Sequence, residues 1–211
     1  MKAGLFGGTF DPIHYGHLRV AEEVREHFVL DRVYFVPALV QPLKQHAKVT
    51  EAADRFKMVQ LAVRGNEFFR ASRAEMRRGG ISYSIETIRA FRGRFSELYF
   101  LVGLDAFSEM HLWRDYRDIF EQAHLVVLVR PIHREVKPVD LFPADIKPFV
   151  RAIDENTYEH ASGKKIYFYR VTQLDISSTM IRELARTGAS FKYLVPQAVE
   201  RFVKEGGLYT G

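Results

Sequence analysis

The chain of 211 residues contains no cysteine, which excludes disulfide bonds and metal sites built from thiolates. Long apolar runs are also absent: residues 98–104 form one of the longest, whereas a membrane-spanning helix needs about 20 apolar residues. The apolar run at residues 3–6 is too short for the core of a signal peptide. We therefore expect a cytoplasmic protein with no membrane association.

A block of consecutive like charges is missing as well, although the formal net charge is +5. A positive balance favours a partner that carries phosphate, which could be a nucleic acid or a small nucleotide. Because the lysines and arginines are spread along the chain, we expect no nucleic-acid partner. With 47% hydrophobic residues, the chain can bury the core of a globular domain.

Short apolar runs alternate with amphipathic segments along most of the chain. The apolar runs predict buried strands at residues 2–6, 32–36, 68–71, 98–102, 125–129 and 166–171. Helical spacing and capping residues predict helices at 16–28, 50–64, 84–95, 177–186 and 196–204, with Thr50 as the N-cap of the second helix. This alternation predicts an α/β fold with a doubly wound parallel sheet.

Residues 131–163 interrupt the alternation. They contain four of the eight prolines and have weak periodicity. We interpret them as a long, variable connection with one short helix, which could serve as a lid or as a contact in a homo-oligomer. Because no linker or internal repeat is evident, residues 1–211 are expected to form a single domain.

The most informative segment is residues 7–17, GGTFDPIHYGH, which follows the first predicted strand and precedes the first predicted helix. Open α/β sheets bind ligands at this end of their strands, and a helix N-terminus favours anions. Gly7 and Gly8 let the backbone approach a phosphate, and His14 and His17 can donate hydrogen bonds to phosphoryl oxygens, more strongly if cationic. The pattern is neither a Walker A loop nor G-x-G-x-x-G.

Simpler interpretations exist for the same residues. His14 could cap a turn, His17 could pack in the core, and the glycines could only shape the turn. The two histidines could also bind a metal, but Asp11 is the only further ligand nearby, so a protein-held metal is not expected. The whole string, in which Thr9 adds a hydroxyl, is more specific than its parts and indicates a nucleotide-triphosphate site.

A second motif lies near the C-terminus, at residues 176–182, ISSTMIR. Ser177 or Ser178 would be the N-cap of a helix, leaving N–H groups and hydroxyls to meet a phosphate. Arg182 lies one turn further, on the face shared with Ser178 and Thr179, and its guanidinium can bind a phosphate bidentately. A capped helix with a solvated arginine is the alternative.

The middle of the chain contains three features that suit a second substrate. Residues 82–87 open a helix whose free N–H groups could receive a carboxylate. Asp105 follows a strand and could accept hydrogen bonds from a ribose. Trp113 is the only tryptophan and could stack on a pyridine ring, although it could equally anchor the core or an interface. Asp105 and the serines could likewise be ordinary helix caps.

These motifs resemble those of the HxGH nucleotidyltransferase superfamily, and the nicotinate-nucleotide adenylyltransferases in particular. The similar family patterns are GGTFDPxHxGH for residues 7–17, SYTxDT for 82–87, GAD…W for 103–113 and ISSTxIR for 176–182. The resemblance covers nearly the whole chain except residues 131–163.

Two segments depart from the family patterns. Glu86 stands where aspartate is usual. Residues 37–44 resemble PAxxPPHK, but Gln41 replaces a proline and Leu43 replaces the histidine, while Lys44 is retained. We therefore still expect a phosphate contact from Lys44.

The resemblance implies a Rossmann-like nucleotidyltransferase fold and transfer of AMP from ATP to nicotinate mononucleotide in NAD biosynthesis, with Mg²⁺ bound through the ATP phosphates. The charge-stabilising residues would be His14, His17, Lys44 and Arg182. The residues implied in ATP binding are Gly7, Gly8, Thr9, Phe10, His17, Gly103, Asp105, Ile176, Ser178, Thr179 and Arg182. The residues implied in acceptor binding are Tyr83, Ser84, Thr87 and Trp113.

The implied reaction needs no general base, because a phosphate monoester with a second pKa near ~6 is largely dianionic at neutral pH. Alternatives are a sister enzyme that uses nicotinamide mononucleotide, pantetheine phosphate or glycerol phosphate, and a non-catalytic nucleotide-binding regulator. An RNA-binding protein is supported only by the net charge.

Overall fold

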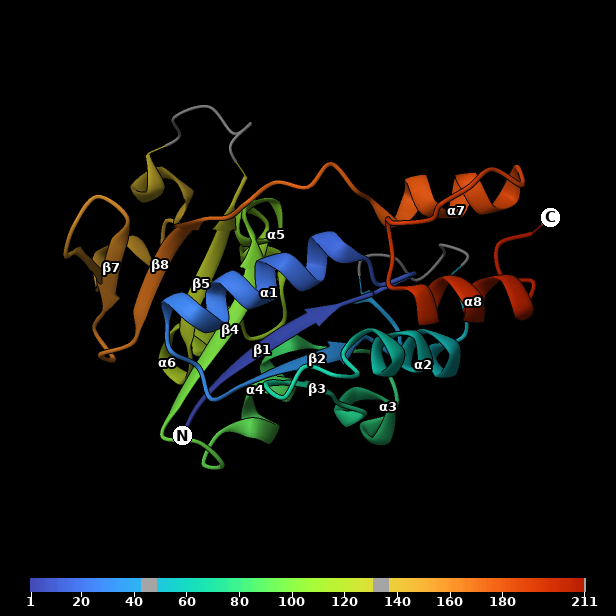
Figure 1. Cartoon of the computed structure of the whole chain (residues 1–211). Coiled ribbons are helices and arrows are strands. Elements are labelled where there is room, and N and C mark those ends of the chain that lie inside the picture. Colours follow the sequence, from blue (N-terminus) through green and yellow to red (C-terminus); the bar gives the residue numbers. More distant parts are fainter. Residues whose placement is uncertain (43–48, 131–136, 211) are drawn as a thin grey trace.

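The computed structural model describes residues 1–42, 49–130 and 137–210, and in them one eight-stranded sheet lies between two layers of helices (Figure 1). The strand order is β3-β2-β1-β4-β5-β8-β7-β6. The parallel strands are β1 (Lys2–Gly8), β2 (Arg32–Pro37), β3 (Phe69–Ala71), β4 (Glu97–Gly103), β5 (His124–Val129) and β8 (Lys165–Arg170). The chain order reverses between β1 and β4, which is where such sheets bind ligands.

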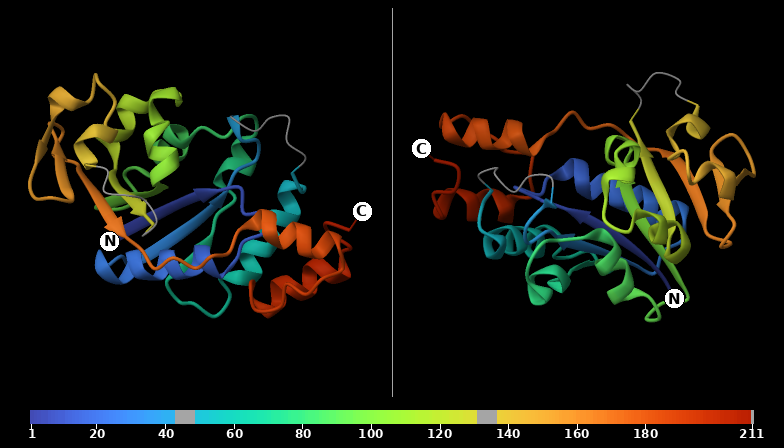
Figure 2. Two further views of the ribbon diagram at one scale, coloured as in Figure 1. Left: turned by 90° about the horizontal axis from the view of Figure 1, so that it is seen from above. Right: turned by 180° about the vertical axis from the view of Figure 1, so that it is seen from behind.

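Both faces of the sheet are buried, because successive side chains of a strand point to opposite sides. On β4, Tyr99 and Leu101 belong to one core and Phe100 and Val102 to the other. The first core is covered by α1 (Tyr15–His27), α2 (Ala52–Ala62), α7 (Ser178–Arg186) and α8 (Gln197–Glu205). The second is covered by α4 (Ser84–Phe91), α5 (Leu104–Ser108) and α6 (Tyr116–Gln122), seen from behind in Figure 2.

The predicted parallel strands are confirmed, with small differences at their ends. The predicted N-cap at Thr50 is wrong: α2 begins at Ala52 with Glu51 at the N-cap. The backbone N–H of Thr50 instead donates to the Asp11 carboxylate at 3.2 Å, so a tertiary contact takes this residue away from the helix. The short elements α3 (Ala74–Arg78), α5, α6 and η2 (Met110–Leu112) were not predicted, because each is too short to show a periodic pattern.

The prediction of a connection with one short helix is wrong for the described part of residues 131–163. It contains two short 3₁₀ helices, η3 (Pro138–Leu141) and η4 (Lys147–Phe149), and the hairpin of β6 (Val150–Ala152) and β7 (Thr157–His160). β7 pairs antiparallel with β8 and thereby extends the sheet. The alternation of buried Tyr158 and His160 with polar neighbours is a strand pattern, but four residues are too few to identify it.

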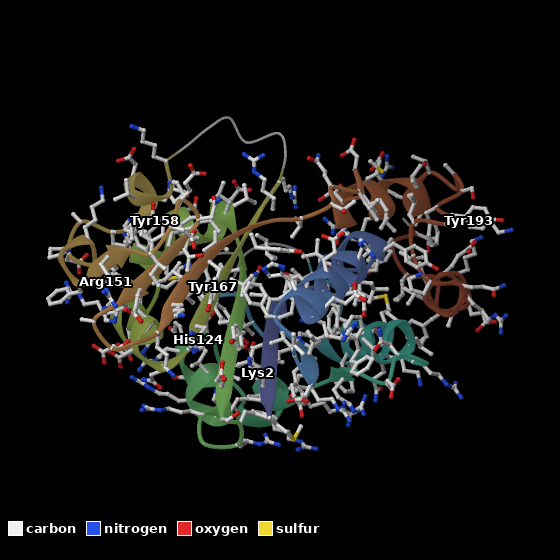
Figure 3. The ribbon with its side chains drawn as sticks, turned by 60° about the vertical axis from the view of Figure 1, so that its left-hand side comes forward. Lys2, His124, Arg151, Tyr158, Tyr167 and Tyr193 are labelled. Carbon is white, nitrogen blue, oxygen red and sulfur yellow. The ribbon has the colours of Figure 1, made fainter. Side chains whose placement is uncertain are left out.

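The last part of the chain crosses back over the sheet. After β8, residues 171–177 pass alongside α1 and lead into α7 (Figures 1 and 2). Figure 3 shows Tyr193, from the C-terminal segment, at the opposite end of the molecule from Arg151 and Tyr158 of the β6–β7 hairpin. None of the described helices is long and apolar enough to cross a membrane.

Candidate nucleotide-binding site

A cleft of about 350 Å³ opens at the carboxyl ends of β1, β4 and β5. Its walls are the first turns of α1, the residues just after β4 and β5, and the crossing segment 171–178. This volume is in the range of small-molecule sites. The predicted site residues that line the cleft are His14, His17, Gly103, Asp105, Ile176 and Ser178.

The loop between β1 and α1 is shaped by Phe10, which has φ of 51° and is 2% exposed. Its ring is buried among Phe6, Phe35 and His17, with centroids 5.7, 5.9 and 5.1 Å away. A Cβ on Gly8 would lie 3.0 Å from this ring, so glycine leaves room for Phe10 to pack against the strand. The buried ring of Phe10 thus anchors the loop, and Gly8 leaves the space that this ring fills.

The two imidazoles of the motif lie face to face. The ring centroids of His14 and His17 are 3.7 Å apart and the ring planes are inclined by 33°. The backbone N–H of His14 donates to Nδ1 of His17 at 3.3 Å. Nδ1 of His17 is then the unprotonated nitrogen, and its Nε2 carries the hydrogen and can donate. A Cβ on Gly16 would lie 3.0 Å from Nδ1 of His14, so glycine makes room for this stack.

Both rings are neutral at neutral pH. Burial lowers the pKa of His14 to about 4, and the positive charge of Arg130 acts in the same direction. Burial, followed by the effects of His14 and Arg130, holds the pKa of His17 well below its ordinary value. The histidines can thus donate hydrogen bonds to phosphate, but they do not bring a positive charge to it.

The C-terminal motif binds the N-terminal loop. Ser177 is the N-cap of α7 and accepts the N–H of Met180 at 3.1 Å, as one of the two predicted choices. The Ser178 hydroxyl donates to the carbonyl of Pro12 at 2.9 Å. The guanidinium of Arg182 donates to the Asp11 carbonyl at 2.7 Å and to Oγ1 of Thr179 at 3.2 Å. Arg182 and Thr179 do not line the cleft, and their contact with phosphate remains a prediction.

Two buried charged groups hold the loop in place: Asp11, which the sequence suggested only as a possible metal ligand, and Arg55, which the sequence analysis did not single out. The Asp11 carboxylate, 5% exposed, accepts the Tyr209 hydroxyl at 2.7 Å as well as the Thr50 N–H. Arg55, 2% exposed, donates to the carbonyl oxygens of Thr9 and Thr50, both at 2.8 Å. A lone arginine in a predicted helix carries no signal that it will be buried, because most helical arginines are exposed.

Gly7 and Gly8 end β1, and Thr9 and Phe10 begin the loop after it; none of the four is among the residues lining the cleft. Lys44 and Leu43 lie outside the described residues. The expected contacts of Gly7, Gly8, Thr9, Phe10 and Lys44 with ATP therefore stay predictions.

The predicted acceptor residues gather on the other face of the sheet. Tyr83, the N-cap of α4, and Trp113 both pack against the second core, with Trp113 edge-on to Phe100 at 6.4 Å between centroids. The Thr87 hydroxyl is buried and donates to Oε1 of Glu75 at 2.7 Å, so it fixes α4. None of these acceptor residues, nor Ser84, lines the cleft.

Glu86, the departure from the family pattern, joins three elements. Its carboxylate lies 2.9 Å from Nε of Arg78 in α3 and 3.5 Å from a guanidinium nitrogen of Arg114. The Arg114 guanidinium also lies 4.7 Å from the centroid of the Tyr83 ring. The longer glutamate thus reaches two arginines at the start of α4.

In the part of the chain that the structure describes, no group of three or more histidine, aspartate or glutamate side chains could hold a metal ion. The donor set of the cleft is instead one of ring N–H groups, hydroxyls and backbone amides, together with Asp105 and Arg130. Such a set suits a phosphorylated ligand.

Comparisons with known proteins show the family to which this chain belongs. A cytidylyltransferase-like family model matches residues 5–184. A "probable nicotinate-nucleotide adenylyltransferase" of Pelobacter propionicus is 45% identical over 100% of this chain and 99% of its own. The protein of the same name from Desulfatibacillum aliphaticivorans is 41% identical over 99% and 100%.

Among solved structures, the nicotinic acid mononucleotide adenylyltransferase of Plasmodium falciparum complexed with NaAD has a TM-score of 0.71 at 15% identity, covering 99% of this chain and 97% of that one. This likeness confirms the predicted Rossmann-like nucleotidyltransferase fold. Because the family model spans most of the chain and the bacterial relatives match it from end to end, the chain belongs to the cytidylyltransferase-like family and, within it, to the nicotinate-nucleotide adenylyltransferases.

Proposed function

We propose that this protein transfers AMP from ATP to nicotinate mononucleotide, forming nicotinate adenine dinucleotide and pyrophosphate. The main support is that three sequence motifs far apart in the chain meet at one cleft, through His14 and His17, Asp105, and Ser178. The names of relatives that are 41% and 45% identical over their whole length add to this support.

In the proposed reaction the triphosphate of ATP binds at the N-terminus of α1, where free N–H groups and the helix dipole favour anions. Asp105 accepts hydrogen bonds from the ribose. An oxygen of the acceptor phosphate attacks the α-phosphorus in line. The new P–O bond forms as the bond from the α-phosphorus to the bridging oxygen breaks, and that electron pair leaves with pyrophosphate. With a second pKa of about 6, the acceptor phosphate requires no base.

The protein's part is to position the reactants and to stabilise charge. Neutral His17 donates a hydrogen bond from Nε2 to the α-phosphate. The His14 N–H, which donates to Nδ1 of His17, keeps the ring hydrogen on Nε2. Arg182 uses two donors within the protein and keeps its other N–H groups for a phosphate. Lys44 adds a further charge.

Mg²⁺ would enter with ATP as part of the substrate and would neutralise part of the negative charge of its phosphates. Asp105 is the one carboxylate among the described residues that line the cleft. Phosphate oxygens and water therefore supply most of the ligands of this ion.

The acceptor binds at the start of α4. Free N–H groups around Ser84 receive the nicotinate carboxylate, and Trp113 stacks on the pyridine ring. Arg78 and Arg114 both lie beside the carboxylate of Glu86 at this helix start. Their positive charges favour the anionic carboxylate of nicotinate mononucleotide over the neutral amide of nicotinamide mononucleotide.

A pyrophosphate-release assay with ATP and a panel of acceptors tests the proposal. We expect release to be fastest with nicotinate mononucleotide, slower with nicotinamide mononucleotide and absent with phosphopantetheine, and a mass spectrum should show nicotinate adenine dinucleotide. ATP without an acceptor is the control for hydrolysis. Equal rates with all acceptors, or release in the absence of acceptor, would overturn the assignment.

A further inference from the structure

The two histidines that line the cleft bring no positive charge to it. A triphosphate and its leaving pyrophosphate carry several negative charges, and catalysis of phosphoryl transfer depends on neutralising them. His14 and His17 are neutral, and the described lining residues with a formal charge are Asp105 and Arg130. Asp105 is negative and would repel a phosphate. Arg130 is therefore the one positively charged side chain among the described residues that line the cleft.

Arg130 lies at the carboxyl end of the parallel strands, where the ligand is expected. It directly follows β5, next to β4, which ends at Gly103 in the same cleft. Its side chain is exposed and forms no hydrogen bond or ion pair with any part of the described chain. Its charge nonetheless acts on the rings of both His14 and His17, so the guanidinium is near the donors proposed for the α-phosphate.

Arg182 differs from Arg130 in this respect. Two of its N–H groups are already used on the Asp11 carbonyl and the Thr179 hydroxyl, and it does not line the cleft. Arg130 is the guanidinium that enters the cleft without a protein partner among the described residues.

We propose that Arg130 is a substrate-binding residue of the adenylyl transfer, whose guanidinium binds the phosphate chain of ATP and stabilises the charge that develops on the leaving pyrophosphate. This inference rests on the proposed function. A guanidinium is suited to the task because it is always charged and its planar fork can bind two phosphate oxygens at once. In this proposal the neutral histidines orient the phosphates through hydrogen bonds, and Arg130 adds a positive charge to the cleft.

Three variants test this assignment: Arg130→Gln, Arg130→Lys and, as a matched control, Arg170→Gln. Arg170 ends β8, the strand beside β5, is also exposed and does not line the cleft. We expect kcat/KM for ATP to fall on the order of 10²-fold in Arg130→Gln, as for loss of a charge-stabilising donor. Arg130→Lys should recover part of this loss, and Arg170→Gln should match the wild type.

Two readouts do not depend on turnover. Calorimetric binding of a non-hydrolysable ATP analogue and of inorganic pyrophosphate should weaken at least tenfold in Arg130→Gln only. An NMR titration should show a higher pKa for His14 in Arg130→Gln than in Arg170→Gln, because the nearby positive charge has been removed. Circular dichroism and thermal melting confirm that each variant is folded.

The outcomes separate this inference from the proposed function. If the wild type releases no pyrophosphate with nicotinate mononucleotide but binds the ATP analogue through Arg130, the proposed acceptor is wrong and the phosphate role of Arg130 stands. If the wild type is active and Arg130→Gln matches Arg170→Gln in analogue binding and kinetics, the role of Arg130 is overturned.

Discussion

His17 owes its chemical form to its surroundings. An imidazole can donate from either nitrogen, but the backbone N–H of His14 occupies Nδ1 and leaves the hydrogen on Nε2. Burial, followed by the effects of His14 and Arg130, then keeps the ring neutral by lowering its pKa. One residue of the motif therefore fixes the tautomer of the other.

Replacing His17 with alanine should lower kcat on the order of 10²-fold while leaving the fold intact, because a donor to the transition state is lost. Steady-state pyrophosphate release measures the effect. His27→Ala is a matched control, since this exposed histidine lies at the other end of α1. Unchanged turnover in His17→Ala would contradict the role.

The buried ring of His14 makes stability depend on pH. Its folded-state pKa of about 4 is below the ordinary 6.5, so the unfolded chain binds more protons and stability falls as the pH drops from 6.5 towards 4. Between pH 7 and pH 5 this ring accounts for about 2 kcal/mol of that loss. His14→Gln should lose about 2 kcal/mol less than the wild type in urea unfolding at the two pH values. Equal losses would show that His14 titrates normally.

At the scale of elements, the start of α1 and the start of α7 form one unit. Ser178 and Arg182 on α7 donate to the carbonyl oxygens of Pro12 and Asp11, which belong to the loop before α1. Hydrogen bonds from side chains to the backbone thus connect the two motifs within the protein itself. This arrangement gives the C-terminal motif a structural role in addition to its predicted contact with phosphate.

Trp113, just after η2, can test whether acceptor binding and ATP binding are separate, as we propose. Trp113→Ala should raise KM for nicotinate mononucleotide far more than KM for ATP, because the indole lies on the second core and away from the ATP cleft. Leu112→Ala serves as the control, since its neighbouring side chain is 61% exposed. Equal changes in both KM values would show that Trp113 only packs against the core.

At the scale of the whole molecule, the two ends of the chain meet at one carboxylate. Tyr209 donates to Asp11 across 198 residues of sequence, and Arg55 joins the same loop from α2. The C-terminal segment therefore helps to hold the N-terminal histidine loop in place.

Tyr209→Phe removes this bond and should lower the free energy of unfolding by about 1–3 kcal/mol, because a buried carboxylate loses one of its donors. Urea or thermal unfolding measures the change. Tyr193→Phe is the comparison, because that ring is 77% exposed at the surface of the same C-terminal region (Figure 3). A loss of the same size in both variants would argue against a special role for the Asp11–Tyr209 bond.

The sequence by itself determined the parallel sheet and the motifs, because buried strands such as β4 and β5 are continuous apolar runs and the histidine loop is a local string of residues. Only the tertiary structure decided what required distant partners. Burial keeps His14 and His17 neutral. Strand order places Arg130 in the cleft, and helix packing places Arg55 against the loop. Pairing with β8 makes β7 a strand. Charge state, burial and pairing depend on neighbours that are remote in sequence, so no local pattern contains them.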